Sequence, residues 1–463
     1  MLNFWDSEVW SWLLLIGVVL GALLVANIIK RKTPFLCDSL IPASVIAGLL
    51  LLIASAIYKA ITGEVMFDAK LFGGRGTETL EIITYHTLAL GFIASSFKTN
   101  GGKLNKKRSG EIIDTGVTTV STYLLQGTIG LAITIVAALI IKGFFPAAGM
   151  LLPFGYGQGT GQALNYGNIY ELDHGFLGGR SFGLTIAALG FLSASIGGVI
   201  HLIVMKKLGR LKKSARNDGS LHTEAIEEKG EMPMQESIDK MTVQIALIVV
   251  AYLITYLLIA LLGKLLPGMK SVIYGFNFLI GVLIATLIKV IMNFFFKKGI
   301  SRKKYTNNFL MTRASNLFFD IMVVAGIAAI RLDALERYWG IMLILGVVGA
   351  AITYVYLRIV SKKLFPEYVE EQFLAMYGML TGTASTGIIL LREVDGEFRT
   401  PASDNLVYQN FPAIVLGFPM LFLATLAPTK PILTMIILAL FFVVLNVFLF
   451  RKYIFRRKPK KDK

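Results

Sequence analysis

Long apolar stretches recur along almost the whole chain and are separated by shorter polar segments. An α-helix needs about 20 residues to cross the hydrocarbon core of a bilayer, and each stretch is close to this length. The eleven stretches are Trp12–Ile29, Leu40–Ile61, Leu80–Phe97, Gly116–Ile141, Ser181–Met205, Thr242–Leu262, Ser271–Phe296, Ser315–Leu335, Gly340–Val360, Phe411–Ala427 and Ile432–Phe450. The pattern predicts an all-α polytopic membrane protein with about eleven transmembrane helices.

One long hydrophilic segment, residues 206–241, follows the fifth stretch. Its mixed charges, Gly and Pro give it no pattern that could bury a core, so we expect a cytoplasmic linker. Because five crossings precede it, the second half starts from the opposite side of the membrane, as in an inverted repeat. We divide the chain into a first repeat (1–205), the linker (206–241), a second repeat (242–427) and an extra carboxyl-terminal helix with a basic tail (428–463).

Each half carries a glycine-rich, moderately apolar segment between its fourth and fifth crossings. Each glycine costs an uninterrupted helix roughly 1 kcal/mol relative to alanine, so closely spaced glycines predict a break. The charges place both flanks of each segment on one side of the membrane. We therefore expect re-entrant hairpins at about residues 147–171 and 373–395, entering from opposite faces.

Polar residues are concentrated at both breaks. Helix amino ends attract anions, and freed carbonyl groups and hydroxyl groups supply oxygen ligands for a small cation. We place the substrate at Gln158, Gly159, Thr160, Gly161, Gly382, Thr383, Ser385 and Thr386, and a sodium ion at Asp320, Gly157 and Thr381. The alternative interpretation is close packing of small residues, with hydroxyl groups that cap local carbonyl groups.

Asp320 is conspicuous as a carboxylate inside a predicted span, which is by default a functional hypothesis. It could bind sodium, accept a proton or face a substrate ammonium group. Alternatively, it lies near the cytoplasmic end of its helix and pairs with Arg313 or with water. Glu81 and His86 begin the equivalent helix of the first half, near its outer end, where we expect a solvated vestibule.

Composition and charge agree with a membrane location. Hydrophobic residues make up 55% of the chain and charged residues only 16%, against about 25% charged in a typical soluble domain. The net charge is +17, and most basic residues face the cytoplasm if the amino end is outside. We expect the plasma membrane, an outside amino end and a cytoplasmic carboxyl end. The basic tail indicates orientation, and nucleic acid is not an expected partner.

Several motifs in these segments resemble the bacterial sodium/glutamate symporter family. GYGQGTG, which begins at Gly155, is similar to the first glycine-rich loop of that family, and GMLTGTASTG, which begins at Gly378, resembles its second. LIPASVIAGLLL, which begins at Leu40, is similar to its second helix, which contains a proline. The resemblance covers roughly residues 10–427. It implies Gly157, Gly159, Thr160 and Gly161 at the first tip and Gly378, Gly382, Ser385 and Thr386 at the second.

The resemblance implies a homodimeric symporter that couples sodium entry to uptake of glutamate or a related carboxylate. A channel would predict rings of polar residues along a pore, and an enzyme would need a cluster of reactive groups. Neither pattern is visible, so we expect no enzyme activity and no cofactor besides the coupling ion. Proton coupling, and an organic anion such as a hydroxycarboxylate or dicarboxylate as substrate, remain alternatives.

Overall fold

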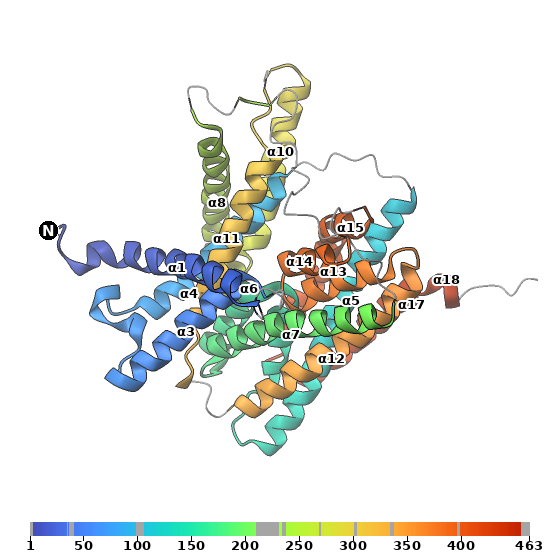
Figure 1. Ribbon diagram of the computed structural model, residues 1–463, viewed down its shortest axis with the longest axis horizontal. Coiled ribbons are helices and arrows are strands. Elements are labelled where there is room, and N and C mark those ends of the chain that lie inside the picture. The colour runs from blue at the N-terminus through green and yellow to red at the C-terminus, as the bar shows by residue number, and fades with distance from the viewer. Residues whose placement is uncertain are drawn as a thin grey trace, which may run out of the picture. The chain divides into compact units, whose positions relative to one another are not determined.

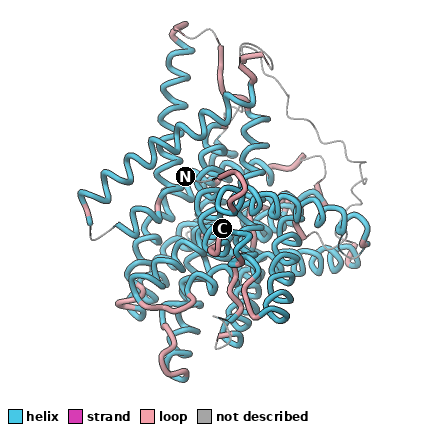
Figure 2. The backbone as a smooth tube through the Cα atoms, turned by 90° about the vertical axis from the view of Figure 1, so that its left-hand side faces the viewer, coloured by secondary structure: helices cyan, strands magenta, loops and turns pink. Residues whose placement is uncertain are grey.

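The computed structural model describes residues 3–34, 36, 41–98, 106–209, 231–233, 238–267, 270–300, 303–333, 338–395 and 399–454. Within these ranges every regular element is a helix, and β-pairing is limited to one isolated bridge between Glu231 and Lys304. Figure 2 shows the backbone coloured by secondary structure. The prediction of an all-α protein is confirmed.

Ten helices in the described part of the chain are long and apolar enough to cross a membrane. They are α1 (Ser7–Lys32), α3 (Ala43–Thr62), α4 (Gly76–Phe97), α5 (Lys106–Ile140), α7 (Gly179–Lys207), α8 (Lys240–Leu265), α10 (Asn277–Lys297), α11 (Asn308–Ala328), α12 (Trp339–Leu364) and α17 (Pro431–Leu449). An eleventh span results if α15 (Ala402–Tyr408) and α16 (Asn410–Leu426), bent by 48°, count as one. The chain is therefore a multi-pass membrane protein.

Three further helices form the two glycine-rich segments. The helix α6 (Leu151–His174) is interrupted by non-helical backbone at Gly159. The helices α13 (Val369–Thr381) and α14 (Ala384–Arg392) are separated at Gly382 and Thr383. None of the three belongs to the ten candidate spans.

The chain divides into two compact units, and we describe each by itself. Unit 1 comprises Met1–Gly102, Thr160–Leu184 and Asp218–Ala334, and unit 2 comprises Lys103–Gly159, Thr185–Asn217 and Leu335–Lys463. The first three crossings of each predicted half thus belong to unit 1, and the fourth crossing and most of the fifth belong to unit 2. The chain passes between the units at Gly159, within α6.

The core of unit 1 is formed where α4, α8, α10 and α11 pack together (Figure 1). Its centre is a cluster of buried apolar side chains: Ile93, Ala94, Phe97, Ile248, Ala251, Ala285, Met311 and Ala314. Two of these helices have side-chain caps at their amino ends. The Asp239 carboxylate accepts hydrogen bonds from the first turn of α8, and the Asn307 side chain accepts one at the start of α11, which satisfies backbone donors that a helix cannot pair internally.

Much of the predicted linker, residues 210–230 and 234–237, lies outside the described residues, as do residues 455–463 of the tail. The described end of the linker is not simply solvated. The ammonium of Lys240, which is fully buried, lies 2.8 Å from Glu231 Oε2, and that oxygen also accepts a hydrogen bond of 2.6 Å from Asn307 Nδ2. Met232 is buried beside them, and its N–H donates to the carbonyl of Lys304. A buried carboxylate must be paired, and this pair fixes the linker end to unit 1.

We predict that Lys240→Ala lowers stability by about 3–5 kcal/mol, because it leaves the Glu231 charge buried without its partner. The double variant Lys240→Met/Glu231→Leu should recover most of this loss, since it removes both charges. Thermal unfolding of the purified protein in detergent measures the three stabilities. A double variant less stable than Lys240→Ala would contradict the pairing.

Candidate functional site

The break in α6 is a single residue, Gly159, with φ 79° and ψ −171°. Only glycine adopts this backbone conformation readily, because a Cβ atom would clash with the chain. The break separates a first arm, residues 151–158, from a second arm, residues 160–174. The second arm therefore begins with a helix amino end at Thr160, where N–H groups lack intrahelical acceptors.

The first arm is anchored in unit 2. Tyr156, which is fully buried, donates from its hydroxyl to the carbonyl of Gly346 at 2.6 Å. The carbonyl of Gly157 accepts a hydrogen bond of 3.1 Å from the Tyr123 hydroxyl in α5. A Cβ atom at Gly157 would lie 2.0 Å from the ring of Tyr123. Gly157 is thus needed for close packing, and its carbonyl oxygen points toward α5.

The second arm lies between α4 and α11 in unit 1. The Thr160 hydroxyl donates to the carbonyl of Met322 at 3.3 Å. A Cβ atom at Gly326 would lie 2.8 Å from Thr160 Cβ, and one at Gly161 would lie 2.7 Å from a Leu88 methyl group. The central glycine of α11 therefore makes room for the arm.

Gln162 is a candidate residue that is absent from the predicted site. It is fully buried, and its Oε1 accepts a hydrogen bond of 3.1 Å from Asn165 Nδ2. Its Nε2 has no hydrogen-bond partner. An unpaired buried donor in the first turn of the second arm suits an anionic ligand. The sequence signal for Gln162 is that it is the third residue after Gly159, the break residue.

The second break is held by local hydroxyl contacts. The Thr383 hydroxyl caps α14 by accepting from the N–H of Thr386 at 3.5 Å. The Thr381 hydroxyl donates to the carbonyl of Tyr377 at 2.6 Å. A Cβ atom at Gly378 would lie 2.7 Å from Gly387 Cα, so glycines let the two arms pack closely. The Ser385 side chain lies outside the described residues.

The two breaks approach each other within unit 2. A Cβ atom at Gly190 of α7 would lie 2.5 Å from the carbonyl oxygen of Thr381 and 3.1 Å from the ring of Tyr156. On α5, Tyr123 contacts Gly157, two residues before the first break, and Gln126, one helical turn later, donates to the carbonyl of Leu380, two residues before the second, at 3.0 Å. The helices α5 and α7 thus hold both breaks.

Asp320 lies in α11 of unit 1, whereas Gly157 and Thr381 belong to unit 2. Asp320 is exposed, and the Ser44 side chain of α3 lies beside its carboxylate. Arg313, the partner considered from the sequence, instead lies over the ring of Phe309 at 4.9 Å. The three proposed sodium ligands therefore belong to two different units.

A family model described as sodium/glutamate symporter matches residues 11–383. The chain belongs to the sodium/glutamate symporter family. The matched part begins in α1 and ends at Thr383, within the second break. No curated protein matches the chain significantly.

Sodium and glutamate are the cargo that the family name gives. The described residues contain no group of three or more His, Cys, Asp and Glu side chains that could hold a metal ion.

Glu81 was expected in a solvated vestibule, and that expectation is wrong. Its carboxylate is buried and lies 2.7 Å from Arg180 NH1. The backbone N–H of Arg180 also donates to Glu171 Oε2 at 3.0 Å, which links α4, the second arm of α6 and the start of α7 in unit 1. Burial of a carboxylate requires such a partner. His86 is exposed, and its Nδ1 lies 2.6 Å from the Tyr252 hydroxyl.

A second ion cluster, which is partly buried and which the sequence did not indicate, lies at the start of the second hairpin in unit 2. Both oxygens of Glu370 accept hydrogen bonds of 2.7 Å from Arg358. Nε2 of the buried His201 is 2.8 Å from Glu370 Oε2. Burial raises the pKa of Glu370, but the hydrogen bonds from His201 and Arg358 and the charge of Arg358 outweigh burial and lower the pKa to about 2.

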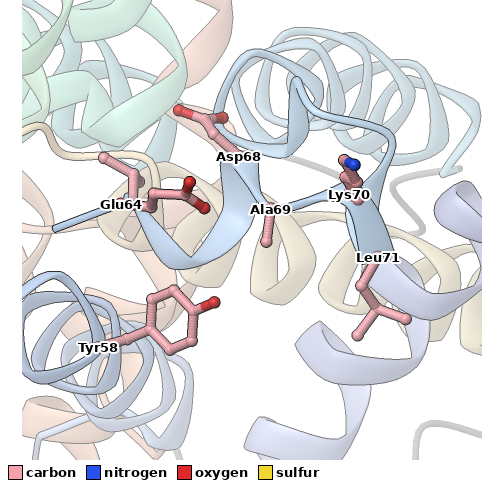
Figure 3. A pocket seen from close by; sticks show the side chains of 7 residues that line it. Tyr58, Glu64, Asp68, Ala69, Lys70 and Leu71 are labelled. Atoms are coloured by element: carbon pink, nitrogen blue, oxygen red, sulfur yellow. The ribbon is translucent and has the colours of Figure 1, made fainter. Parts of the chain in front are cut away.

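An open pocket in unit 1 contains none of the predicted site residues (Figure 3). It is lined by Tyr58, Glu64, Val65, Asp68, Ala69, Lys70 and Leu71, around the connection between α3 and α4. Asp68 already accepts a hydrogen bond from the N–H of Thr77 at 3.0 Å. The glycine-rich breaks therefore remain the better candidate site.

We predict that Gly159→Ala reduces uptake at least tenfold, because alanine in this backbone conformation costs about 1–3 kcal/mol and displaces the break. Gly382→Ala should have a smaller effect, since its Cβ atom would lie 3.0 Å from the carbonyl oxygen of Gly378 at negative φ. Gly21→Ala is the matched control, because nothing lies within 4 Å of its Cβ position. Transport assays with equal amounts of inserted protein compare the variants, and wild-type uptake by Gly159→Ala would contradict the role of the break.

We also predict how stability depends on pH at Glu370. Because its folded-state pKa of about 2 is below its ordinary value of 4.5, ionised Glu370 stabilises the fold above pH 4.5, and this stabilisation is lost as pH falls toward 2. Glu370→Gln should therefore flatten the fall in melting temperature over that range. Glu367→Gln, which alters an exposed pair with Lys107, should leave the profile near wild type. Identical profiles for wild type and Glu370→Gln would exclude this contribution.

Proposed function

We propose that the protein is a sodium-coupled symporter for glutamate or a related carboxylate, and that the two breaks hold the cargo. The observation that carries the proposal is the convergence of both breaks on α5 and α7 within unit 2, in a chain whose family transports sodium and glutamate. Broken helices paired in this way are the form in which secondary transporters build their sites.

The proposed substrate residues are divided between the two units. Those in unit 2 are Gln158, Gly159, Gly382, Thr383, Ser385 and Thr386, and those in unit 1 are Thr160 and Gly161. In unit 1, the amino end of the second arm and the unpaired Nε2 of Gln162 offer donors to a carboxylate. Gly157, Thr381 and Asp320 stay proposed as contributors to cation binding.

We propose alternating access as the transport mechanism. The chain crosses from unit 2 to unit 1 at Gly159, where the backbone has a conformation that few residues other than glycine adopt. The assignment of the helices to two compact units supports motion of one group of helices relative to the other.

We further propose a plasma-membrane homodimer with its amino end outside and its carboxyl end in the cytoplasm. The dimer follows from the family resemblance. The orientation is supported by basic residues in the last turns of α1, α7, α10 and α12, all of which would face the cytoplasm.

Uptake into proteoliposomes tests the function. We expect accumulation of labelled glutamate, or of a related carboxylate from a panel of amino acids, dicarboxylates and hydroxy acids, when an inward sodium gradient is imposed at fixed pH. We expect sodium rather than proton coupling because neutral oxygens at the breaks can bind a cation and do not take up protons themselves. A pH gradient that drives uptake equally well in the absence of sodium would favour proton coupling instead, and the absence of uptake for the whole panel would contradict the symporter assignment.

A further inference from the structure

Gln126 is a buried polar residue whose role the proposed function leaves open. It lies in α5 with no exposed surface, and its Nε2 donates to Thr353 Oγ1 at 2.8 Å and to the carbonyl of Leu380 at 3.0 Å. Its Oε1 is buried and has no hydrogen-bond partner. An acceptor in this state is unfavourable unless something else binds it.

The orientation of the Gln126 amide is fixed by its neighbours. The carbonyl of Leu380 can only accept a hydrogen bond, so the amide nitrogen must face it. Rotation of the amide by 180° would place Oε1 of Gln126 against the carbonyl oxygen of Leu380 and would leave that carbonyl without this hydrogen-bond donor. The unpaired atom is therefore the oxygen, and an oxygen acceptor binds either a donor group or a cation.

The surroundings of Gln126 favour a cation. Leu380 and Thr381 are the last residues of α13, a helix of 13 residues, and carbonyl groups at a carboxyl end carry partial negative charge. The two hydrogen-bond partners of the Gln126 amide, Thr353 and Leu380, are both uncharged. Carbonyl groups at the ends of broken helices are the groups that coordinate sodium in secondary transporters.

We propose that Gln126 Oε1 is a ligand of the coupling sodium ion, together with carbonyl oxygens at the carboxyl end of α13. The proposal rests on the proposed function, and it identifies a cation ligand on α5, outside both glycine-rich segments. It also gives the sodium ion a set of ligands that lies entirely within unit 2. Asp320 is not required for this set.

Sodium binding to the purified full-length protein tests the proposal without transport. Two measurements give the apparent sodium affinity: binding of labelled sodium, and the rise of the melting temperature as sodium is added. Potassium or choline replaces sodium so that the ionic strength stays constant. We expect Gln126→Leu to weaken it at least tenfold, because leucine has a similar size and no oxygen. Gln126→Glu should bind sodium more tightly than wild type, since it keeps an oxygen and adds charge.

Two control variants separate loss of the oxygen from loss of packing. Gln409→Leu replaces another buried glutamine of unit 2, whose Oε1 already accepts a hydrogen bond of 2.8 Å from Thr119. Thr353→Val removes an acceptor of the Gln126 amide and leaves Oε1 in place. Both should lower the melting temperature and keep wild-type sodium affinity.

The outcomes distinguish this proposal from the proposed function. If the wild-type protein does not respond to sodium, sodium coupling itself fails. If the wild-type protein responds and Gln126→Leu responds with the same affinity, the oxygen binds only water and the proposal is overturned. Should Gln126→Leu not fold, an unchanged sodium affinity in Gln126→Glu would overturn it equally.

Discussion

The structure depends on one constraint, which is that backbone outside a helix must be buried and paired at the depth of a membrane. The chain leaves helical geometry at Gly159 and at Gly382, and both places are buried. The neighbouring helix α5 donates hydrogen bonds from Tyr123 to a carbonyl near the first break and from Gln126 to a carbonyl near the second. A lipid-facing break would leave such carbonyl groups unpaired, so the breaks must lie among other helices.

Small residues make this enclosure possible. In unit 1, a Cβ atom at Gly167 would lie 2.4 Å from the carbonyl oxygen of Gly179, and one at Gly183 would lie 2.3 Å from that of Ala163. In unit 2, Gly190 has the same role beside Thr381. Close approach of helix backbones through small residues is a common means of packing in membranes. Many of the glycines near the breaks therefore serve packing, and the backbone conformation at Gly159 is a separate requirement.

The crossings and the positions of the breaks follow from sequence, because hydropathy over 20 residues and clustered glycines are local signals. The buried charges do not follow in the same way. Glu81 pairs with Arg180 and Glu370 with His201, and these partners are far apart in the chain. The unpaired oxygen of Gln126 is less predictable still. It depends on hydrogen bonds that the amide nitrogen donates to Thr353 and Leu380, which lie on two other helices. The Thr381 hydroxyl donates to the Tyr377 carbonyl one turn earlier, as the alternative packing interpretation of the hydroxyl groups predicted.

The distribution of charge bears on how coupling would arise. The buried Glu81 and the partly buried Glu370 each pair with a basic side chain, and the hydrogen bonds from Tyr123 and Gln126 near the two breaks in unit 2 are made by uncharged groups. In an uncharged, buried site, an anion or a cation alone carries a desolvation cost that neutral dipoles only partly offset. A carboxylate and a sodium ion bound together compensate each other's charge. Each therefore raises the affinity for the other, and by linkage the increase is reciprocal. In the proposed function, symport would follow from this mutual compensation, because each ion offsets part of the desolvation cost of the other.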